Sequence, residues 1–199
     1  MPASPTIGVL ALQGAYEAHA KVLTALGATP KLIRLPKDLA GSEGEKIDGL
    51  IIPGGESTTM LKFLERNDFF SILQTFVQTT PTFGTCAGAI LLAKDVTHPT
   101  QKSLSALDIT VERNAYGRQN DSVILTAPTS LPGTPLEMVF IRAPRITRTG
   151  PAVEILAIRD GAPVLVREGH LLAATFHPEL SADSRVHQLF LDMINDLAR

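Results

Sequence analysis

The chain has 199 residues, of which 44% are hydrophobic and 19% are charged, and its formal net charge is −2 at pH 7. This length and apolar content predict one compact domain with a real core and argue against a globally disordered chain. The sequence has no run of basic residues and therefore gives no support to nucleic-acid binding. We expect a single domain over residues 1–199.

Cysteine content and apolar stretches indicate where the protein works. Cys86 is the only cysteine, so no intramolecular disulfide can form, and the chain has no C-x-x-C pair. The apolar stretch at residues 7–12 follows no basic region and is too short for a signal-peptide core. No stretch approaches the roughly 18 apolar residues that span a bilayer. These features predict a cytoplasmic protein that does not enter a membrane.

Apolar runs alternate with helical patterns through the first half of the chain. Strands are predicted for residues 6–12, 30–35, 48–52 and 81–86, and helices for residues 15–26, 57–67, 69–78 and 87–95. Gly27 is the expected C-terminal cap of the first helix, whereas Ser57 or Thr58 and Asp68 are expected N-terminal caps. This alternation is typical of a parallel sheet with helices on both faces.

The second half has a different pattern. Strands are predicted at hairpin-like spacing for residues 122–127, 137–141, 153–159, 163–167 and 171–176, and an amphipathic helix for residues 182–197. We therefore predict a three-layer α/β fold: a mostly parallel central sheet, helices on both faces, and an additional antiparallel strand region in the second half. Three loops after parallel strands are candidates for the site, at residues 13–14, 53–57 and 84–88.

The loop that holds the cysteine has the form G-x-C-x-G, from Gly84 to Gly88. It is the thiol version of the nucleophile elbow, in which small neighbours permit a sharp strand-to-helix turn. The N-terminus of the next helix favours a thiolate at Cys86, and the backbone N–H of Ala87 can face a developing oxyanion. A structural turn with a buried cysteine explains this loop alone equally well.

A catalytic cysteine needs a base, and five histidines are available. His19 and His187 lie in the first and last predicted helices, and we expect both on the helix surface. His98 lies in a polar loop and His170 at a hairpin turn.

His177 differs because Glu179 follows two residues later. Residues i and i+2 of an extended segment point to the same side, and Pro178 favours an extended backbone at His177. Glu179 can therefore orient the imidazole and leave its other nitrogen for Cys86. Taken alone, His-Pro-Glu is more simply a strand that ends in a loop. Beside the cysteine turn, we favour catalysis.

The second glycine loop is PGGEST, residues 53–58. It is not a phosphate-binding P-loop, because no Lys follows the glycines in the required order. Gly54 or Gly55 could supply a second oxyanion donor, and Glu56 and Ser57 could bind polar groups of a small substrate. A tight turn with a helix cap is an equally good explanation of the loop alone.

PGGES, FGTCAG and HPE, in this order, resemble the motifs of class I (triad) glutamine amidotransferases. The chain resembles one subfamily more closely, the glutaminase subunits of pyridoxal 5'-phosphate synthase (the PdxT/SNO family). The segments that carry this resemblance are LQG at 12–14, PGGESTTM at 53–60, FGTCAG at 83–88, VERNAYGRQ at 111–119, FIRAP at 140–144 and FHPEL at 176–180. It extends from about residue 7 to the C-terminal helix.

The resemblance implies a role for each residue of the site. Cys86 would be the nucleophile, His177 the general base and acid, and Glu179 the orienting carboxylate. The backbone amides of Gly55 and Ala87 would form the oxyanion hole. The residues that bind glutamine would be Gly55, Glu56, Ser57, Arg113, Ile141 and Arg142. Of these, Arg113, Ile141 and Arg142 rest on the resemblance alone.

The implied reaction is hydrolysis of L-glutamine to L-glutamate and ammonia through a cysteine thioester, with no metal or cofactor. Since the chain has no room for an acceptor domain, the ammonia must pass to another polypeptide. The resemblance supplies a (β/α)₈-barrel synthase subunit in a hetero-oligomer, which makes pyridoxal 5'-phosphate (vitamin B6) from ribose 5-phosphate, glyceraldehyde 3-phosphate and ammonia. Gln13 is the expected partner-facing residue. We hypothesise that Gln13-Gly14 and the first helix help to form the docking face and to set the oxyanion hole.

Two other functions fit parts of the pattern. A hydrolase or peptidase on the same turn would use Cys86 and His177 but would leave Glu56 and Arg113 without a role. A non-catalytic binding module on the same fold is disfavoured by the intact set of cysteine, histidine and glutamate.

Overall fold

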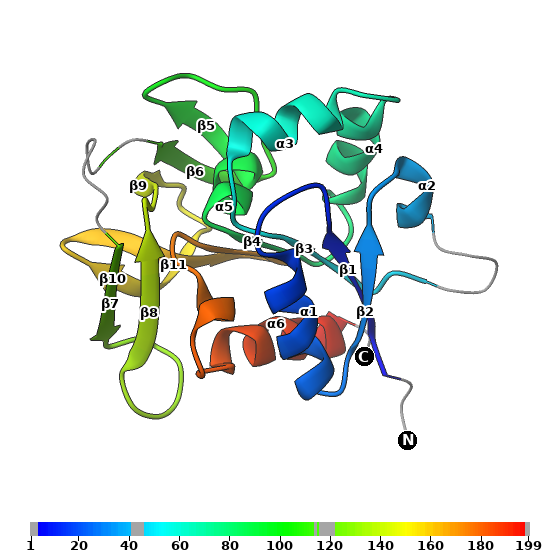
Figure 1. Ribbon diagram of the computed structural model, residues 1–199. Coiled ribbons are helices and arrows are strands. Elements are labelled where there is room, and N and C mark those ends of the chain that lie inside the picture. The colour runs from blue at the N-terminus through cyan, green and yellow to red at the C-terminus, as the bar shows by residue number, and fades with distance from the viewer. Residues whose placement is uncertain (1–3, 41–45, 114, 116–121, 198–199) are drawn as a thin grey trace.

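A computed structural model describes residues 4–40, 46–113, 115 and 122–197. Its centre is a sheet of seven strands (Figure 1), which are β1 (Thr6–Leu10), β2 (Thr29–Ile33), β3 (Gly49–Ile52), β4 (Thr82–Thr85), β10 (Glu154–Arg159), β11 (Ala162–Glu168) and β12 (Leu171–Ala174). Their order across the sheet is β10-β11-β12-β4-β3-β1-β2. The five strands from β12 to β2 pair in parallel, whereas β11 is antiparallel to both of its neighbours. The predicted mostly parallel sheet is confirmed.

Helices cover both faces of this sheet, which confirms the three predicted layers (Figure 1). One face carries α1 (Tyr16–Ala25) and α6 (Arg185–Leu197), and the other carries α3 (Ser57–Leu64), α4 (Phe69–Phe76) and α5 (Ala87–Leu92). The short α2 (Pro36–Leu39) follows β2, and a 3₁₀ turn, η1 (Pro178–Leu180), precedes α6. Among the described residues, no helix combines the length and the hydropathy that a membrane span requires.

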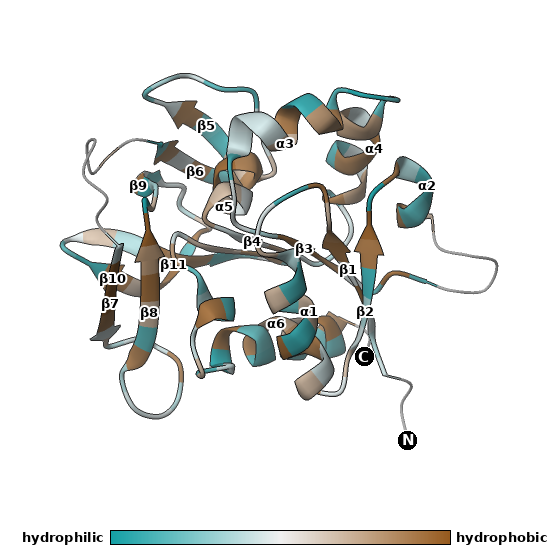
Figure 2. Ribbon diagram, viewed as in Figure 1, coloured by the Kyte–Doolittle hydropathy of each residue, from teal (hydrophilic) through white to brown (hydrophobic). Residues whose placement is uncertain are grey.

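The sheet divides the hydrophobic core into two clusters, as β3 illustrates. Its side chains alternate between the faces: Leu50 and Ile52 pack into the cluster that includes Leu64 of α3, and Ile51 into the cluster that includes Phe190 of α6. Because β3 is buried on both faces, it is a continuous apolar run rather than an alternating one. Figure 2 shows the central strands in the hydrophobic colour and the hydrophilic residues mainly on helices and outer loops.

In the described part of the chain, five further strands lie outside the central sheet. The antiparallel hairpin of β7 (Ser122–Ala127) and β8 (Leu136–Ile141) was predicted, and the three-stranded sheet of β5 (Ala93–Thr97), β6 (Leu107–Glu112) and β9 (Arg145–Thr149) was not. The helix predicted over residues 87–95 is wrong at its end, because Ala93 adopts φ −56° and ψ 145° and the chain continues as β5. β6 alternates buried and half-buried residues, a period-two signal that the sequence analysis missed.

The helix caps agree only in part with the prediction. Gly27 follows α1 with φ +83°, as expected for a residue after a helix C-terminus. The N-cap of α3 is Glu56, not Ser57 or Thr58, because the Glu56 side chain accepts the backbone N–H bonds of Thr58 and Thr59. Asp68 occupies the N-cap position of α4, but its side chain makes no cap hydrogen bond. Residues 114 and 116–119 of the VERNAYGRQ motif lie outside the described residues.

The turn between β4 and α5 depends on two glycines. A Cβ atom on Gly88 would lie 1.9 Å from the carbonyl oxygen of Ile52, and one on Gly84 would lie 2.6 Å from the backbone of Gly88. Both distances are far below any tolerated contact, so α5 begins directly against the sheet. Cys86, between the glycines, adopts φ 47° and ψ −102°, a strained conformation for a side-chain-bearing residue.

We expect Gly88→Ala to lower the free energy of unfolding by about 3 kcal/mol or more, because backbone must move to admit the methyl group. Gly27→Ala is the matched control, since a Cβ there meets open space and only the positive φ is strained. Its expected cost is about 1 kcal/mol. Urea unfolding of the two variants measures the difference, and equal losses would contradict the packing argument.

Candidate active site

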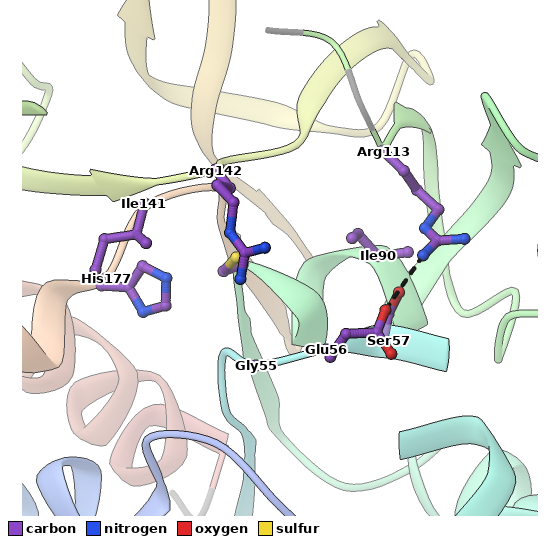
Figure 3. Close-up of a pocket in the computed structure, with 9 residues that line it drawn as sticks. Gly55, Glu56, Ser57, Ile90, Arg113, Ile141, Arg142 and His177 are labelled. Atoms are coloured by element: carbon purple, nitrogen blue, oxygen red, sulfur yellow. Dashed lines mark hydrogen bonds and ion pairs between the residues drawn. The ribbon is translucent and has the colours of Figure 1, made fainter. Parts of the chain in front are cut away.

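Three loops meet at the carboxyl ends of β1, β3 and β4, which are neighbouring strands of the central sheet. The loops after β3 and β4 border a pocket (Figure 3), and the loop after β1 does not line it. The lining residues are Gly55, Glu56, Ser57, Cys86, Ile90, Arg113, Ile141, Arg142 and His177. The predicted nucleophile, the predicted base and all six predicted glutamine-binding residues are therefore in one cavity. Ile90 is the one lining residue that the sequence analysis did not single out. Ala87 and Glu179 are buried and do not line the pocket.

The cysteine turn is fixed by backbone hydrogen bonds to the sheet and to the following helix. The backbone N–H of Cys86 donates to the carbonyl of Ala174 at the end of β12, with an N–O distance of 2.8 Å. Its carbonyl accepts from the N–H of Ile90, which closes the first turn of α5. Cys86 lines the pocket but is only 6% exposed, so little bulk water contacts it.

His177 and Glu179 form a buried pair. Nδ1 of His177 lies 2.7 Å from Oε1 of Glu179, and each residue is 6% exposed. The predicted contact is present, but the predicted extended segment is wrong: Pro178–Leu180 is a 3₁₀ turn, and it brings the carboxylate back to the imidazole. The turn starts at a fixed point, because the His177 N–H donates to the carbonyl of Val139 in β8.

The charge state of His177 follows from its neighbours. Burial acts to lower the pKa of His177, but hydrogen bonds to Cys86 and Glu179, and their negative charges, outweigh burial and raise it to about 10. His177 therefore carries a proton at neutral pH. A protonated imidazole beside a thiol at a helix N-terminus is the arrangement that activates cysteine nucleophiles.

The glycine loop packs against both the triad and the first loop. A Cβ on Gly54 would lie 2.3 Å from Cε1 of His177, so only glycine fits there. The Gly54 carbonyl accepts a bond from the N–H of Ala15 at 3.2 Å, and the Glu56 N–H donates to Oε1 of Gln13 at 3.3 Å. The side chain of Gln13 thus lies against the loop that contains Gly55.

Glu56 and Arg113 form one wall of the pocket (Figure 3). Nη2 of Arg113 lies 3.4 Å from Oε1 of Glu56, whose carboxylate also caps α3. Burial acts to raise the pKa of Glu56, but hydrogen bonds from the side chains and backbone of Thr58 and Thr59 overcome it and lower the pKa to about 2. Ser57 is buried and donates to Oε1 of Gln101 at 2.9 Å. Glu56 is therefore a fixed negative charge held by its own helix.

Ile141 and Arg142 form the opposite wall. Ile141 ends β8 and lies beside His177, and Arg142 extends toward the space between His177 and Glu56 in the view of Figure 3. Arg142 has φ 45°, a sparsely populated conformation that is common at functional sites. The pocket thus holds two arginines, a residue type that binds carboxylate groups well.

The prediction that His19 and His187 lie on helix surfaces is wrong. Both are 0% exposed, and Nδ1 of His19 lies 2.9 Å from Nε2 of His187. Helical periodicity placed each residue on its helix, but it did not show that the two helices meet on the same face of the sheet. Each histidine stands alone in its helix sequence, so no local pattern indicated that the two would be in contact.

Because His19 and His187 are buried, we expect the free energy of unfolding to decrease at acid pH. Burial lowers the pKa of His19 well below its usual value, with the charges of His187 and His177 adding to the effect, and burial lowers the pKa of His187 to about 4. Near pH 6.5 and below, the unfolded chain binds protons at both residues that the folded chain does not bind. Stability is therefore fully present above about pH 6.5 and falls as the pH decreases to about 4.5, by about 2 kcal/mol or more.

Urea unfolding between pH 7 and 4.5 measures this loss. We expect His187→Gln to reduce the pH dependence, since glutamine does not titrate, and the exposed control His98→Gln to retain it. A free energy of unfolding that stays constant over this range would contradict the prediction. His177, with its raised pKa, has the opposite dependence: its contribution to stability is fully present below about pH 6.5 and is lost as the pH rises toward 10, so it offsets a small part of the loss between pH 7 and 4.5.

Comparisons with known proteins agree with one another. The model of the SNO glutamine amidotransferase family matches residues 9–196. The pyridoxal 5'-phosphate synthase subunit PdxT of Koribacter versatilis (strain Ellin345) is 60% identical over 190 residues, which cover 96% of each chain. The protein of the same name from Solibacter usitatus (strain Ellin6076) is 50% identical and covers 94% of this chain and 98% of the relative.

Solved structures of glutamine amidotransferases are also similar to this chain. A crystal structure of a glutamine amidotransferase superposes with a TM-score of 0.85 at 42% identity, over 95% of this chain and 98% of the other. A glutamine amidotransferase from Thermotoga maritima superposes with a TM-score of 0.60 at 12% identity, over 98% of this chain and 85% of the other. The second likeness supports the fold alone.

Proposed function

The chain belongs to the SNO glutamine amidotransferase family and is the glutaminase subunit of a pyridoxal 5'-phosphate synthase, and we propose that Cys86, His177 and Glu179 carry its chemistry. The observation that supports this assignment is the buried pair of His177 and Glu179, 2.7 Å apart, of which His177 lines the same pocket as Cys86. The whole chain, residues 1–199, forms one glutaminase domain in this proposal.

Glutamine binds with its charged end between the two arginines. Arg113 and Arg142 bind the α-carboxylate, and the fixed charge of Glu56 attracts the α-amino group. Ile90 and Ile141 pack against the methylene groups. Every charge on the amino-acid end of the substrate then has an opposite charge in the pocket, which directs the side-chain amide toward Cys86.

The thiolate of Cys86 attacks the amide carbon of the side chain and forms a tetrahedral oxyanion. Backbone N–H groups of Gly55 and Ala87 stabilise this oxyanion, and each donor contributes about 10²–10³ in rate. The proton on His177 moves to the leaving nitrogen, the C–N bond breaks, and ammonia and the thioester result. Glu179 stabilises the protonated imidazole before this step and keeps Nδ1 as a donor after it.

Hydrolysis of the thioester restores the enzyme. His177, now neutral, takes a proton from water, and the hydroxide attacks the thioester carbon. The C–S bond breaks, so Cys86 leaves as the thiolate and glutamate is released. The thiolate and the protonated imidazole are then ready for the next substrate.

The ammonia is delivered to a synthase subunit, and we propose that this partner is a (β/α)₈ barrel in a hetero-oligomer. The location that we expect for this assembly is the cytoplasm. The first statement rests on the resemblance of the six motifs, and a purified complex with a matching synthase subunit tests it. The second rests on the presence of a single cysteine and on the shortness of the apolar stretches.

We expect Cys86→Ala to abolish glutamine-dependent ammonia release, with a loss of at least about 10⁴-fold, because no other group can form the thioester. The assay measures glutamate for the wild type and the variant, each with and without a matching synthase subunit. Full activity of the variant would refute the cysteine mechanism. Wild-type activity on peptides rather than glutamine would support the competing hydrolase.

Gln13 remains the predicted link between the partner and the oxyanion hole. Its side chain lies against the Gly55 loop and accepts from the Glu56 N–H. We expect Gln13→Ala to lower the synthase-stimulated kcat by about 10-fold, since the loop loses a contact that fixes its backbone. Association with the synthase subunit is measured in parallel, and unchanged association and unchanged stimulation would contradict the hypothesis.

A further inference from the structure

Two buried histidines lie directly behind the catalytic triad and have no part in the reaction described above. His19 belongs to α1 and His187 to α6, and the residues are 168 positions apart in the sequence. Nδ1 of His19 lies 2.9 Å from Nε2 of His187. The contact therefore joins the two helices that cover one face of the sheet.

The other ring nitrogen of His19 faces the triad. Nε2 lies 3.1 Å from Oγ1 of Thr85, the residue before the nucleophile, and 3.4 Å from Oε2 of Glu179. Oε1 of Glu179 is already bound to His177. Within the described residues, Oε2 is buried and has no hydrogen-bond partner at normal distance, so the N–H of His19 is the donor best placed to compensate it.

The surroundings of the histidine pair are apolar. The ring of Phe83 packs edge-on against both, with centroid distances of 6.3 Å to His19 and 5.8 Å to His187, and Phe190 packs on Phe83 at 5.7 Å. Burying polar rings there costs free energy, and apolar side chains of similar shape would fill the same space at less cost. Packing alone thus gives no reason for two histidines.

Hydrogen bonding selects one tautomer of each ring. If His19 carried its proton on Nδ1, its Nε2 lone pair would face the Glu179 carboxylate, and His187 would keep a buried N–H on Nδ1 without an acceptor. If His187 donates from Nε2 instead, His19 accepts at Nδ1 and donates from Nε2 toward Glu179 and Thr85. The unpartnered atom is then only the Nδ1 lone pair of His187, which is the smaller cost.

We propose that His19 is a positioning residue for glutamine hydrolysis: its Nε2–H, set by His187, stabilises Oε2 of Glu179 and aims the carboxylate at His177. This inference rests on the proposed roles of Cys86, His177 and Glu179. Each oxygen of Glu179 then faces one imidazole N–H, and His19 couples the acid to the strand that carries the nucleophile.

Both imidazoles behind the triad are neutral at the pH of the reaction. The pKa of His19 is held well below its usual value by burial first and then by His187 and His177, and burial lowers that of His187 to about 4. The charged groups that face His19 are Glu179 and, beyond it, His177. A neutral donor stabilises the carboxylate without removing its charge, so Glu179 can still stabilise the protonated His177.

Two substitutions at position 19 distinguish the role of Nδ1 from the role of Nε2. Asparagine places its amide near the Nδ1 position, toward His187, and cannot reach Glu179, whereas glutamine extends one bond farther, to the Nε2 position. With a matching synthase subunit, we expect His19→Asn to lower kcat by about 10- to 100-fold with KM for glutamine within about twofold. His19→Gln retains kcat within about fivefold of the wild type.

Two controls distinguish positioning from stability. Leu23→Val alters the same buried face of α1 without touching the triad, and its kcat stays within about twofold of the wild type at a similar loss of Tm. In a Glu179→Gln background, His19→Asn has no further effect on kcat, because the carboxylate that it serves is gone. An unchanged kcat for His19→Asn, or an equal loss in both backgrounds, would overturn the inference.

A spectroscopic test needs no variant. Nitrogen-15 NMR of the wild-type chain at pH 7 should show His19 neutral, with the proton on Nε2 and a bare Nδ1. A proton on Nδ1 of His19 would overturn the inference even if His19→Asn failed to fold. If the wild-type complex released no ammonia from glutamine, the proposed function would fail, and the NMR result would still decide the arrangement of the histidines.

Discussion

The site depends on the close contact between the turn that carries Cys86 and the strand beside it. A Cβ on Gly88 would lie 1.9 Å from the carbonyl oxygen of Ile52, so α5 can begin directly on β3 only if this residue is glycine. The Cys86 N–H is bound to Ala174 on the other neighbouring strand. Since backbone contacts fix the turn on both sides, the position of the sulfur does not depend on flexible side chains.

The loops around the turn are packed just as closely. Gly54 faces His177 and Cys86 so closely that a Cβ would lie 2.3 Å from the imidazole, and a Cβ on Gly14 would lie 1.9 Å from the Gly54 carbonyl oxygen. The Gly14 loop thus packs on the backbone of the Gly54 loop, which in turn packs on the side chains of His177 and Cys86. A displacement of α1, which follows Gly14, would disturb the Gly54–Gly55 peptide, and the proposed docking of a partner at α1 could reach the proposed oxyanion donor of Gly55 in this way.

Most of the fold and the reactive residues of the site could be predicted from local sequence patterns. Buried strands such as Gly49–Ile52 and the cysteine turn each lie within a short segment of sequence. An apolar run therefore predicted the strand, and small residues predicted the sharp turn. Contacts between distant segments were not predictable from such patterns: His19 became buried because α1 and α6 cover the same face. The cap of α3 was a local error, because Glu56, one residue before the predicted cap, accepts the N–H bonds of Thr58 and Thr59. Arg113 and Arg142 were assigned by the resemblance and not by any physical pattern.

The two glutamates of the site have different surroundings, and these fit them for different tasks. Glu56 is bound by four donors of the first turn of α3 and by Arg113, so its negative charge is fixed and its place is the substrate-facing wall. Within the part of the chain that the structure describes, the buried carboxylate of Glu179 faces two imidazoles, His177 at 2.7 Å on one oxygen and His19 at 3.4 Å on the other. His19 is the neutral and more distant of the two, so it leaves most of the field of the carboxylate for the protonated His177. In the proposed reaction the charge of His177 changes, and the burial of His19 and His187 is the cost of keeping that field directed at it.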